Sequence, residues 1–214
     1  MKIKASHITN LTDARYFAAR DVEWMSFDFR EKSSDYIDPM KARAMFAWVE
    51  GPIIVGEFDH MTGDEIRFYA DAWGLKAVQV GMFSDIEVVK ALQGLPIIKE
   101  IWIEPFTNRE VVEKTLKAYL PYVEVFQLNF KNGKIAWQDI NTEGSVINIG
   151  DLEALCRNYK IILDIDFDTA DIAGIKNYPL SGLNLKGGTE ERIGVKTFDE
   201  LDDIFDALDN EMML

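Results

Sequence analysis

Several short apolar runs in this sequence end in side chains that could move a proton or bind an ion. The first run, Ile3 to Ile8, carries Ser6 and His7 near its end, and Asn10 then follows as the predicted N-cap of a helix. Later runs end in further candidates of the same kinds, namely Asp28, Asp59, His60, Asn129, Asp164, Asp166 and Lys186. Imidazole and carboxylate groups serve in general acid–base catalysis, and together they also ligate divalent cations.

Amphipathic helices alternate with these runs along the chain. The predicted strands are residues 3–8, 24–29, 52–58, 77–80, 96–103, 125–130, 160–165 and 183–185. Asp38 before Pro39 opens one helix, and Gly74 ends another. Capping boxes predict helix starts at 62–65, 84–87, 107–110 and 197–200. Asn132-Gly133 predicts a tight turn, with a small hairpin that includes residues 135–137.

Such an alternation of strands and helices predicts an α/β fold with a parallel sheet. Eight repeats favour closure into a (β/α)8 TIM barrel that forms one domain over residues 1–214, and a doubly wound open sheet is the alternative. In a barrel the carboxyl ends of all strands meet at one mouth. We therefore expect the candidate side chains to gather there.

Composition restricts the partners of the protein. The net charge is −14, from 37 acidic and 23 basic residues, which argues against a nucleic-acid backbone as the ligand. The sequence contains neither an apolar run long enough to span a membrane nor a signal peptide, and we expect a cytoplasmic protein. The single cysteine, Cys156, is expected to be a buried packing residue on a helix.

The order of these segments resembles the phosphoribosylanthranilate isomerases, which are barrels of tryptophan biosynthesis. The resemblance lies in residues 4–10 with 13–14, then in 32–39, 55–58, 77–80, 97–99, 182–188 and 194–196. It spans nearly the whole chain in the right order. It implies a TIM barrel whose mouth opens a phosphorylated aminofuranose in an Amadori rearrangement. We expect no cofactor, with a divalent cation as the alternative.

The catalytic positions depart from the family pattern. The resemblance implies a cysteine base on the first strand and an aspartate acid on the sixth, and this chain has Ser6 and Asn129 there. A serine hydroxyl without an adjacent base is not ionised at neutral pH, and an amide cannot act as a general acid. Each such group contributes about 10² to 10⁴ in rate, so we expect most of the isomerase activity to be lost.

The binding positions depart as well. Asp35 stands where the family has an arginine for the anthranilate carboxylate, and two carboxylates about 4 Å apart repel by roughly 4 kcal/mol at an effective dielectric constant near 20. Asp164 and Asp166 occupy the segment where the family has a glycine pair that holds phosphate. An anion still suits Lys186, Gly187 and Gly188 after the eighth strand. Gln79, in one of the matched segments, completes the candidate ligand-binding residues.

Three hypotheses follow for the mouth. The first is a degenerate barrel that has lost the isomerisation and binds another small ligand or a protein partner, as a monomer or a homodimer. The second is a working isomerase in which His7 or Asp28 has taken over the proton transfers. The third is a metal-dependent enzyme, with a divalent cation on a set drawn from Asp28, Asp59, His60, Asp164 and Asp166. The crowded acids need a counter-charge, which could be Lys186, a cation or bound protons.

Overall fold

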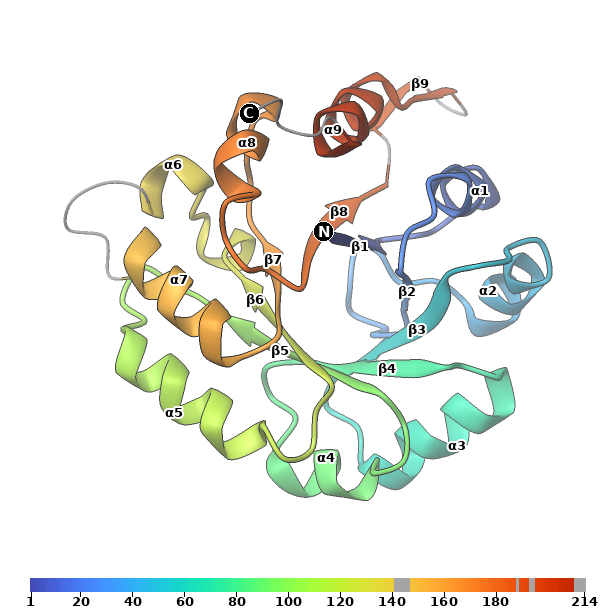
Figure 1. Cartoon of the computed structure of the whole chain (residues 1–214). Coiled ribbons are helices and arrows are strands. Elements are labelled where there is room, and N and C mark those ends of the chain that lie inside the picture. Colours follow the sequence, from blue (N-terminus) through green and yellow to red (C-terminus); the bar gives the residue numbers. More distant parts are fainter. Residues whose placement is uncertain (141–146, 188, 193–194, 210–214) are drawn as a thin grey trace.

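Eight parallel strands close into a barrel with the helices on its outside (Figure 1). The computed structural model describes residues 1–140, 147–187, 189–192 and 195–209. The barrel strands are β1 (Lys2–Ser6), β2 (Trp24–Asp28), β3 (Ile53–Phe58), β4 (Ala77–Val80), β5 (Ile97–Trp102), β6 (Val125–Asn129), β7 (Ile161–Asp164) and β8 (Gly182–Lys186). Each strand pairs with the next, and β8 pairs with β1. The predicted (β/α)8 barrel is confirmed, and the alternative of an open sheet is wrong.

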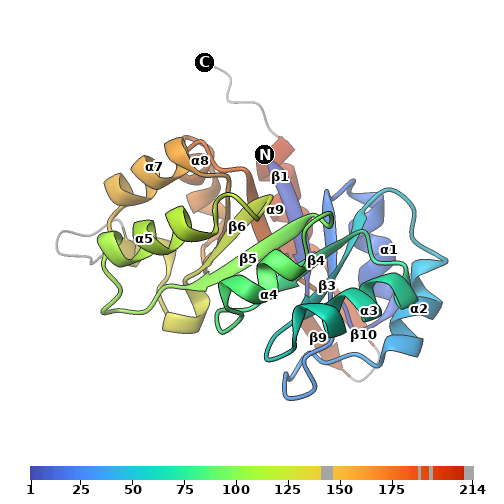
Figure 2. The same ribbon diagram turned by 90° about the horizontal axis from the view of Figure 1, so that it is seen from below.

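The remaining elements connect the strands. The helices are α1 (Leu11–Ala19), α2 (Pro39–Phe46), α3 (Gly63–Trp73), α4 (Ile86–Ala91), α5 (Arg109–Tyr119), α6 (Trp137–Ile140), α7 (Ile149–Asn158), α8 (Ile172–Ile175) and α9 (Asp199–Asp209). Two 3₁₀ turns cover Lys131–Gly133 and Thr169–Asp171. An antiparallel pair that the sequence did not predict, β9 (Thr189–Arg192) and β10 (Val195–Thr197), follows β8. In Figure 2, β1 starts at the upper end of the barrel, and β9 and β10 lie at the lower end with the carboxyl ends of the strands.

Several helix starts are those that the sequence predicts. Asn10 caps α1 by accepting a hydrogen bond from the backbone N–H of Asp13. Asp38 caps α2, with Pro39 in its first turn. Thr62 and Glu65 form the predicted capping box of α3, and that helix ends at Gly74. Local side-chain chemistry therefore fixes these starts as expected.

Two predicted caps are wrong by one residue, and the last helix starts one residue later than its predicted cap implies. Asp85, and not Ser84, caps α4, and its carboxylate accepts hydrogen bonds from two backbone N–H groups. Asn108 caps α5, while the neighbouring Thr107 hydroxyl accepts from the backbone N–H of Glu104 in the preceding loop. α9 begins at residue 199, because Thr197 is the last residue of β10. Adjacent residues compete for a cap, and tertiary contacts select between them.

The predicted hairpin near Asn132 is also wrong. Residues 131–133 form a 3₁₀ turn, and α6 starts at Trp137 instead of a strand. Gly133 packs against the preceding loop so closely that a Cβ atom there would lie 2.3 Å from the carbonyl oxygen of Ile103. The glycine therefore serves this close approach rather than a hairpin turn.

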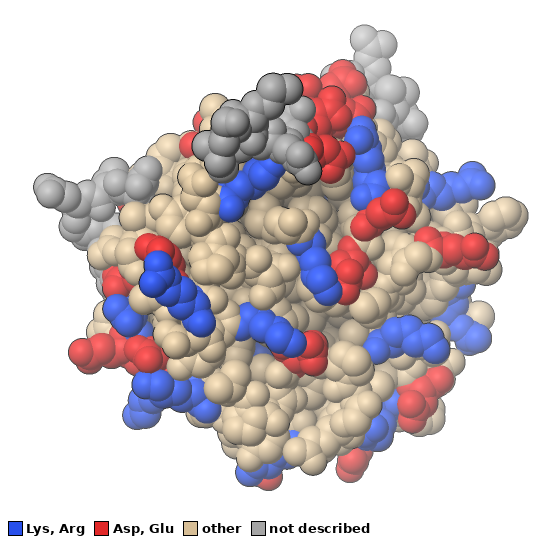
Figure 3. Space-filling view, in the orientation of Figure 1, with Lys and Arg blue, Asp and Glu red and all other residues tan. Residues whose placement is uncertain are grey.

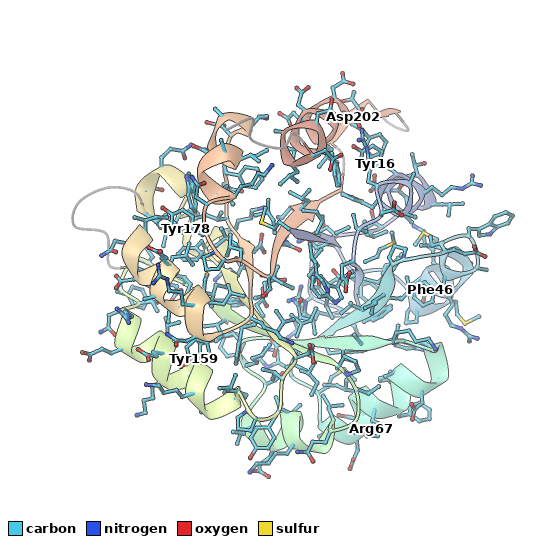
Figure 4. The ribbon with its side chains drawn as sticks, viewed as in Figure 1. Tyr16, Phe46, Arg67, Tyr159, Tyr178 and Asp202 are labelled. Carbon is cyan, nitrogen blue, oxygen red and sulfur yellow. The ribbon has the colours of Figure 1, made fainter. Side chains whose placement is uncertain are left out.

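α1 and α9 pack together where the barrel closes. Tyr16 stacks on Phe198 with ring centroids 4.1 Å apart, and its hydroxyl donates to Asp202 at 2.7 Å (Figure 4). Arg20 also donates to Asp202. These contacts join the first and last helices of the chain.

The surface carries mixed charge. On the face shown in Figure 3, basic and acidic side chains are interspersed.

Cys156 is buried as predicted, and burial raises the pKa of its thiol to about 12. None of the helices in the described ranges is long and apolar enough to cross a membrane.

Candidate functional site at the barrel mouth

The barrel interior has an apolar layer below a polar one. Side chains from six strands form the apolar cluster, which consists of Trp24, Val55, Ala77, Ile98, Val125 and Ile162. Two residues further along, each of these strands turns a buried polar side chain the same way, namely Ser26, Glu57, Gln79, Glu100, Gln127 and Asp164. Lys4 and Asn184 extend this set on β1 and β8. The polar layer forms the floor of the mouth.

Glu57 is the centre of one half of this layer. Its carboxylate accepts hydrogen bonds from Lys4 Nζ at 3.0 Å, Ser26 Oγ at 2.6 Å and Arg30 Nη2 at 3.0 Å. Burial alone would raise the pKa of Glu57, but the charges of Lys4 and Arg30 outweigh burial, and the pKa is lowered. Glu57 is therefore an ionised structural group, and Lys4 is the buried partner that it requires.

Asp28, one of the two predicted replacement bases, accepts hydrogen bonds from Arg30. The guanidinium forms a bidentate pair with Asp28, at 2.8 Å from Nε and 2.6 Å from Nη2. Burial opposes the charge of Arg30, but its hydrogen bonds to Asp28 and the charge of Glu57 raise its pKa. Arg30 therefore engages both oxygens of the Asp28 carboxylate, and a base at Asp28 stays a prediction.

The two positions that the resemblance assigns to the catalytic acid and base lie at the mouth. The Ser6 hydroxyl donates to the carbonyl of Leu185 at 3.3 Å and accepts from the side-chain amide of Asn184 at 3.0 Å. Asn129 donates to Glu100 Oε1 at 2.7 Å. Ser6 is therefore held by a backbone carbonyl and an amide, and Asn129 by a buried carboxyl. Among the described residues, no imidazole or carboxylate accepts a hydrogen bond from Ser6.

His7 and Asp35 are paired across the mouth. His7 Nδ1 contacts the Asp35 carboxylate, and both side chains are partly exposed. The backbone of His7 has a φ of 60°, a left-handed conformation that favours glycine. A histidine in this conformation costs energy and is held by its surroundings. The pair leaves Nε2 of His7 free of this contact, so a base at His7 stays a prediction.

Acidic side chains on and after β7 have a basic partner that the sequence did not predict. Lys131 Nζ lies 3.3 Å from Asp164 Oδ1 and 3.6 Å from Asp166 Oδ1. The expected counter-charge, Lys186, is exposed at the end of β8. Gly187 approaches Asp13 so closely that a Cβ atom would lie 2.8 Å from Asp13 Oδ2. Gly188 falls outside the described residues.

The predicted metal ligands do not form a group. Asp28 is bound by Arg30, while Asp166 is exposed and lies near Lys131. Asp59 and His60 contact each other at 3.8 Å at the end of β3. Across the part of the chain that the structure describes, no three His, Cys, Asp or Glu side chains are placed to hold a metal ion. The structure therefore does not bring the expected cation ligands Asp28, Asp59, His60, Asp164 and Asp166 together among the described residues.

A cavity of about 300 Å³ lies at the centre of the mouth. Its charged lining residues are Arg30, Asp35, Glu57, Glu100, Lys131, Asp164 and Lys186, with His7 at the rim. It meets an aromatic groove of about 970 Å³ through Arg30, Ser34, Trp102 and Asn132, which line both. Gln79 is buried in the polar layer but does not line the cavity. A second cavity of about 530 Å³, bounded by Lys131 and Lys186, lies beside β7 and β8.

The surroundings of Glu100 raise the pKa of its carboxyl. Burial is the largest cause that raises the pKa of its carboxyl, and the charges of Glu57 and Asp164 add to it. The hydrogen bond from Asn129 and the charge of Arg30 oppose the rise without cancelling it. Glu100 therefore keeps a proton at pH values where an ordinary glutamate has lost it.

The sequence reading missed several residues of this site. Glu57 and Glu100 each stand two positions after an apolar interior residue, so strand alternation could have placed them in the barrel. Arg30 and Lys131 each lie two residues beyond their strands, and Glu57 and Asp164, which they contact, come from other strands. Such pairings are set by the closed barrel, and the local sequence carries no signal for them.

Several solved protein structures have the same architecture as this chain. The phosphoribosylanthranilate isomerase of Thermus thermophilus superposes with a TM-score of 0.76 at 23% identity, covering 97% of this chain and 98% of that one. The fold is that of the phosphoribosylanthranilate isomerases. The enzyme of Thermotoga maritima gives a TM-score of 0.76 at 21% identity, covering 97% and 98% of the two chains. That of Pyrococcus furiosus gives 0.75 at 12% identity, covering 99% and 100%.

These matches confirm the phosphoribosylanthranilate isomerase fold that the order of segments predicts. A 3-hexulose-6-phosphate synthase also superposes, with a TM-score of 0.66 at 10% identity, covering 97% of this chain and 99% of that one. No family model and no curated protein matches the sequence. At identities of 23% or less the likeness establishes the fold, and the function has to be argued from the mouth itself.

Proposed function

We propose that the barrel mouth binds a small polar ligand that lacks a phosphate group, and that it does not isomerise phosphoribosylanthranilate. The observation that carries this proposal is the state of the two positions that the resemblance assigns to catalysis. Ser6 is hydrogen-bonded to an amide and a carbonyl, and Asn129 is an amide donor to Glu100. Neither side chain can take or give the proton that the rearrangement requires.

The first binding position also opposes the isomerase substrate. Asp35 contacts His7 in the place where the resemblance implies an arginine for a carboxylate. A substrate carboxylate would have to displace His7 or approach a group of its own charge. Like charges at this range are unfavourable in a partly buried mouth.

The cavity beside β7 and β8 is poorly suited to phosphate. Lys131 and Lys186 line it, but so do Asp166, Asp199 and Glu200. Lys131 is already paired with Asp164 and Asp166. The remaining side-chain charge is acidic, whereas a phosphate held by side chains needs an excess of positive charge.

A second candidate is a proton-transfer enzyme that acts on a different substrate. The His7–Asp35 pair favours it, because a carboxylate that holds one ring nitrogen orients the other toward a substrate. The unfavourable backbone conformation of His7 supports the same interpretation. This candidate keeps the small-ligand site and adds a reaction to it.

Binding of a phosphorylated product analogue tests the proposal. Reduced 1-(o-carboxyphenylamino)-1-deoxyribulose 5-phosphate, which occupies one of the solved isomerase structures, can be titrated calorimetrically into this protein and into the Thermotoga maritima enzyme in parallel. We expect binding to the reference enzyme and no measurable heat with this protein at about millimolar ligand. A Kd within about tenfold of the reference value would overturn the proposal.

A further inference from the structure

The aromatic groove of about 970 Å³ adjoins the central cavity on the side of β2 to β5. The deeper part of its lining is a cluster of four rings from the ends of β2 and β3 and from α3, namely Phe29, Phe58, Tyr69 and Trp73. The ring centroid of Trp73 lies 4.6 Å from that of Phe29 and 4.6 Å from that of Tyr69. Phe58 lies 5.6 Å from Phe29. The groove therefore rests on an aromatic cluster and not on the polar layer of the barrel.

The exposed part of the groove lining is aromatic as well. Phe83, in the loop after β4, is 59% exposed. Its ring stacks on His60 with centroids 5.2 Å apart, and it forms a T-shaped contact with Trp102, also at 5.2 Å. Tyr36, in the loop after β2, is 39% exposed and lines the groove too. Exposed apolar side chains that gather in one groove indicate a binding surface, whereas single ones are common on any protein.

The loops that carry these rings are held in place. Lys99 donates to three backbone carbonyls of the loop after β4, between Gly81 and Ser84. A Cβ atom at Gly81 would lie only 2.6 Å from Asp59 Oδ2, in the loop after β3. Asp59 also accepts a hydrogen bond from the backbone N–H of His60 at 3.0 Å. The two loops are therefore fixed against each other, and a ligand does not have to order them first.

The groove carries no net charge. With His60 counted as neutral, its charged lining consists of two basic and two acidic side chains, namely Arg30, Lys32, Glu31 and Asp59. Arg30 is bound to Asp28 and Glu57. Glu31 and Lys32 are exposed neighbours of opposite charge. A charged ligand group would lose hydration here without meeting a net opposite charge, so the groove favours an uncharged group.

The groove is separate from the position that the resemblance assigns to the anthranilate carboxylate. Asp35 stands at that position and lines the central cavity, whereas Tyr36 lines the groove. The groove is also about three times as large as the cavity, at about 970 against about 300 Å³. A space of this size suits a group larger than a single ring.

We propose that the groove binds an uncharged aromatic group of two or more rings, carried by a ligand whose polar part lies in the central cavity. Trp102 and Asn132 line both spaces, so one molecule can occupy them together. Stacked and T-shaped contacts with the ring lining favour an aromatic group over a saturated group of the same size. This inference rests on the proposed small-ligand site and names its ligand class.

Calorimetry with matched ring compounds at pH 7 tests the groove on the full chain. 2-Naphthol is compared with decahydro-2-naphthol, which has the same ring skeleton without aromaticity. It is also compared with 2-naphthoate, which keeps both aromatic rings and adds a negative charge. We expect 2-naphthol to bind about threefold or more tightly than either control.

Derivatives of 2-naphthol with an uncharged polar substituent test the shared space. The probes are its ethylene glycol ether, its glycerol ether and 2-naphthyl β-D-glucoside. At least one of them should bind about threefold or more tightly than 2-naphthol, because its polar part reaches the central cavity.

Variants separate the groove from general adsorption to the surface. Phe83→Ala should weaken binding of 2-naphthol by about threefold or more, because it removes an exposed ring of the lining. Tyr36→Ala is an independent second variant in another loop. The matched control is Phe106→Ala, because Phe106 is 77% exposed and does not line the groove. That variant should bind like the wild type.

Three results would overturn the inference. The first is that decahydro-2-naphthol or 2-naphthoate binds as tightly as 2-naphthol. The second is that Phe83→Ala and Tyr36→Ala both bind as the wild type does, and the third is that no polar derivative binds more tightly than 2-naphthol. Each leaves the loss of isomerase function intact, since that proposal depends on Ser6 and Asn129 and is measured with the phosphorylated product analogue.

Discussion

The side-chain amide of Asn129 donates a hydrogen bond to Glu100 Oε1 at 2.7 Å, while its own oxygen accepts from the backbone N–H of Asn132 at 2.9 Å. The amide is therefore fixed from both sides. The donor faces a carboxyl whose pKa is raised, first by burial. An aspartate at position 129, as the resemblance would have it, could not satisfy Glu100 in the same way.

Asn129→Asp should destabilise the protein, and the penalty should grow with pH. Two carboxyls this close cannot both ionise, so the folded state keeps a proton that the unfolded chain releases above about pH 4.5. A folded state that binds more protons loses stability as pH rises. We expect a penalty of about 1 to 3 kcal/mol at pH 8 and less at pH 5, measured by urea unfolding. A penalty independent of pH would contradict the Asn129–Glu100 relationship.

Lys4→Met should be among the most damaging changes in the barrel. Lys4 is fully buried, and its ammonium lies 3.0 Å from Glu57 Oε1. Without Lys4, the buried Glu57 carboxylate lacks one of its two main counter-charges. The free energy of unfolding at pH 7 should therefore fall by about 3 kcal/mol or more. Lys4→Met with Glu57→Gln is the control and should regain a large part of the loss. A single variant within about 1 kcal/mol of the wild type would show that the pair is dispensable.

Glu57 also gives this pair a pH dependence. Because the pKa of Glu57 is lowered in the fold, its contribution is present above the unfolded value of 4.5 and is lost as pH falls through the lowered pKa. The difference between Lys4→Met and the wild type should therefore shrink on acidification below about pH 4. Unfolding curves at pH 7 and pH 3 measure it.

Lys99→Met tests a buried amine on the outside of the barrel. Lys99 Nζ donates to the carbonyls of Gly81, Met82 and Ser84, and burial lowers its pKa to about 8. Loss of these hydrogen bonds should cost about 1 to 3 kcal/mol at pH 7. Between about pH 8 and 10.5 the folded chain binds fewer protons than the unfolded one, so the wild type should gain stability relative to the variant as pH rises. A gap that narrows over this range would refute the assignment.

His7→Gly should stabilise the fold while removing the proposed base. Glycine adopts a φ of 60° without a clash, whereas this conformation destabilises a histidine. The contact with Asp35 is partly exposed and therefore contributes little to the free energy of unfolding. We expect a gain of about 1 kcal/mol in the free energy of unfolding, measured by chemical denaturation. Asp35→Asn, which breaks the same contact without changing the backbone, should show no such gain. A loss of stability in His7→Gly would mean that the histidine is a structural residue.

The barrel itself could be predicted from local patterns. β4 spans residues 77–80 as expected, and the capping box of Thr62 and Glu65 starts α3 as expected. Apolar periodicity and side-chain capping are local properties, and they survive in the folded chain. The wrong cap at Ser84 and the wrong hairpin at Asn132 lie where tertiary contacts decide between two local solutions.

The composition of the mouth could be predicted only in part. Ser6, Asn129 and Asp35 could be placed there because they end or follow strands. The long-range partners of the acids could not, since Arg30 reaches Glu57, and Lys131 lies near Asp164, only after the barrel closes. From the sequence alone, the expected counter-charge was therefore a cation, Lys186 or bound protons.

The most direct test of the account is the isomerase assay itself. Purified protein is incubated with phosphoribosylanthranilate beside the Thermotoga maritima enzyme, and the gene is tested for rescue of a tryptophan auxotroph that lacks the isomerase. We predict no turnover and no rescue for the wild type, and none for Ser6→Cys with Asn129→Asp, because Asp35 and the acids near Lys131 still oppose a doubly anionic substrate. Turnover within about tenfold of the reference enzyme, lost in His7→Gln, would contradict the account and establish a rewired isomerase.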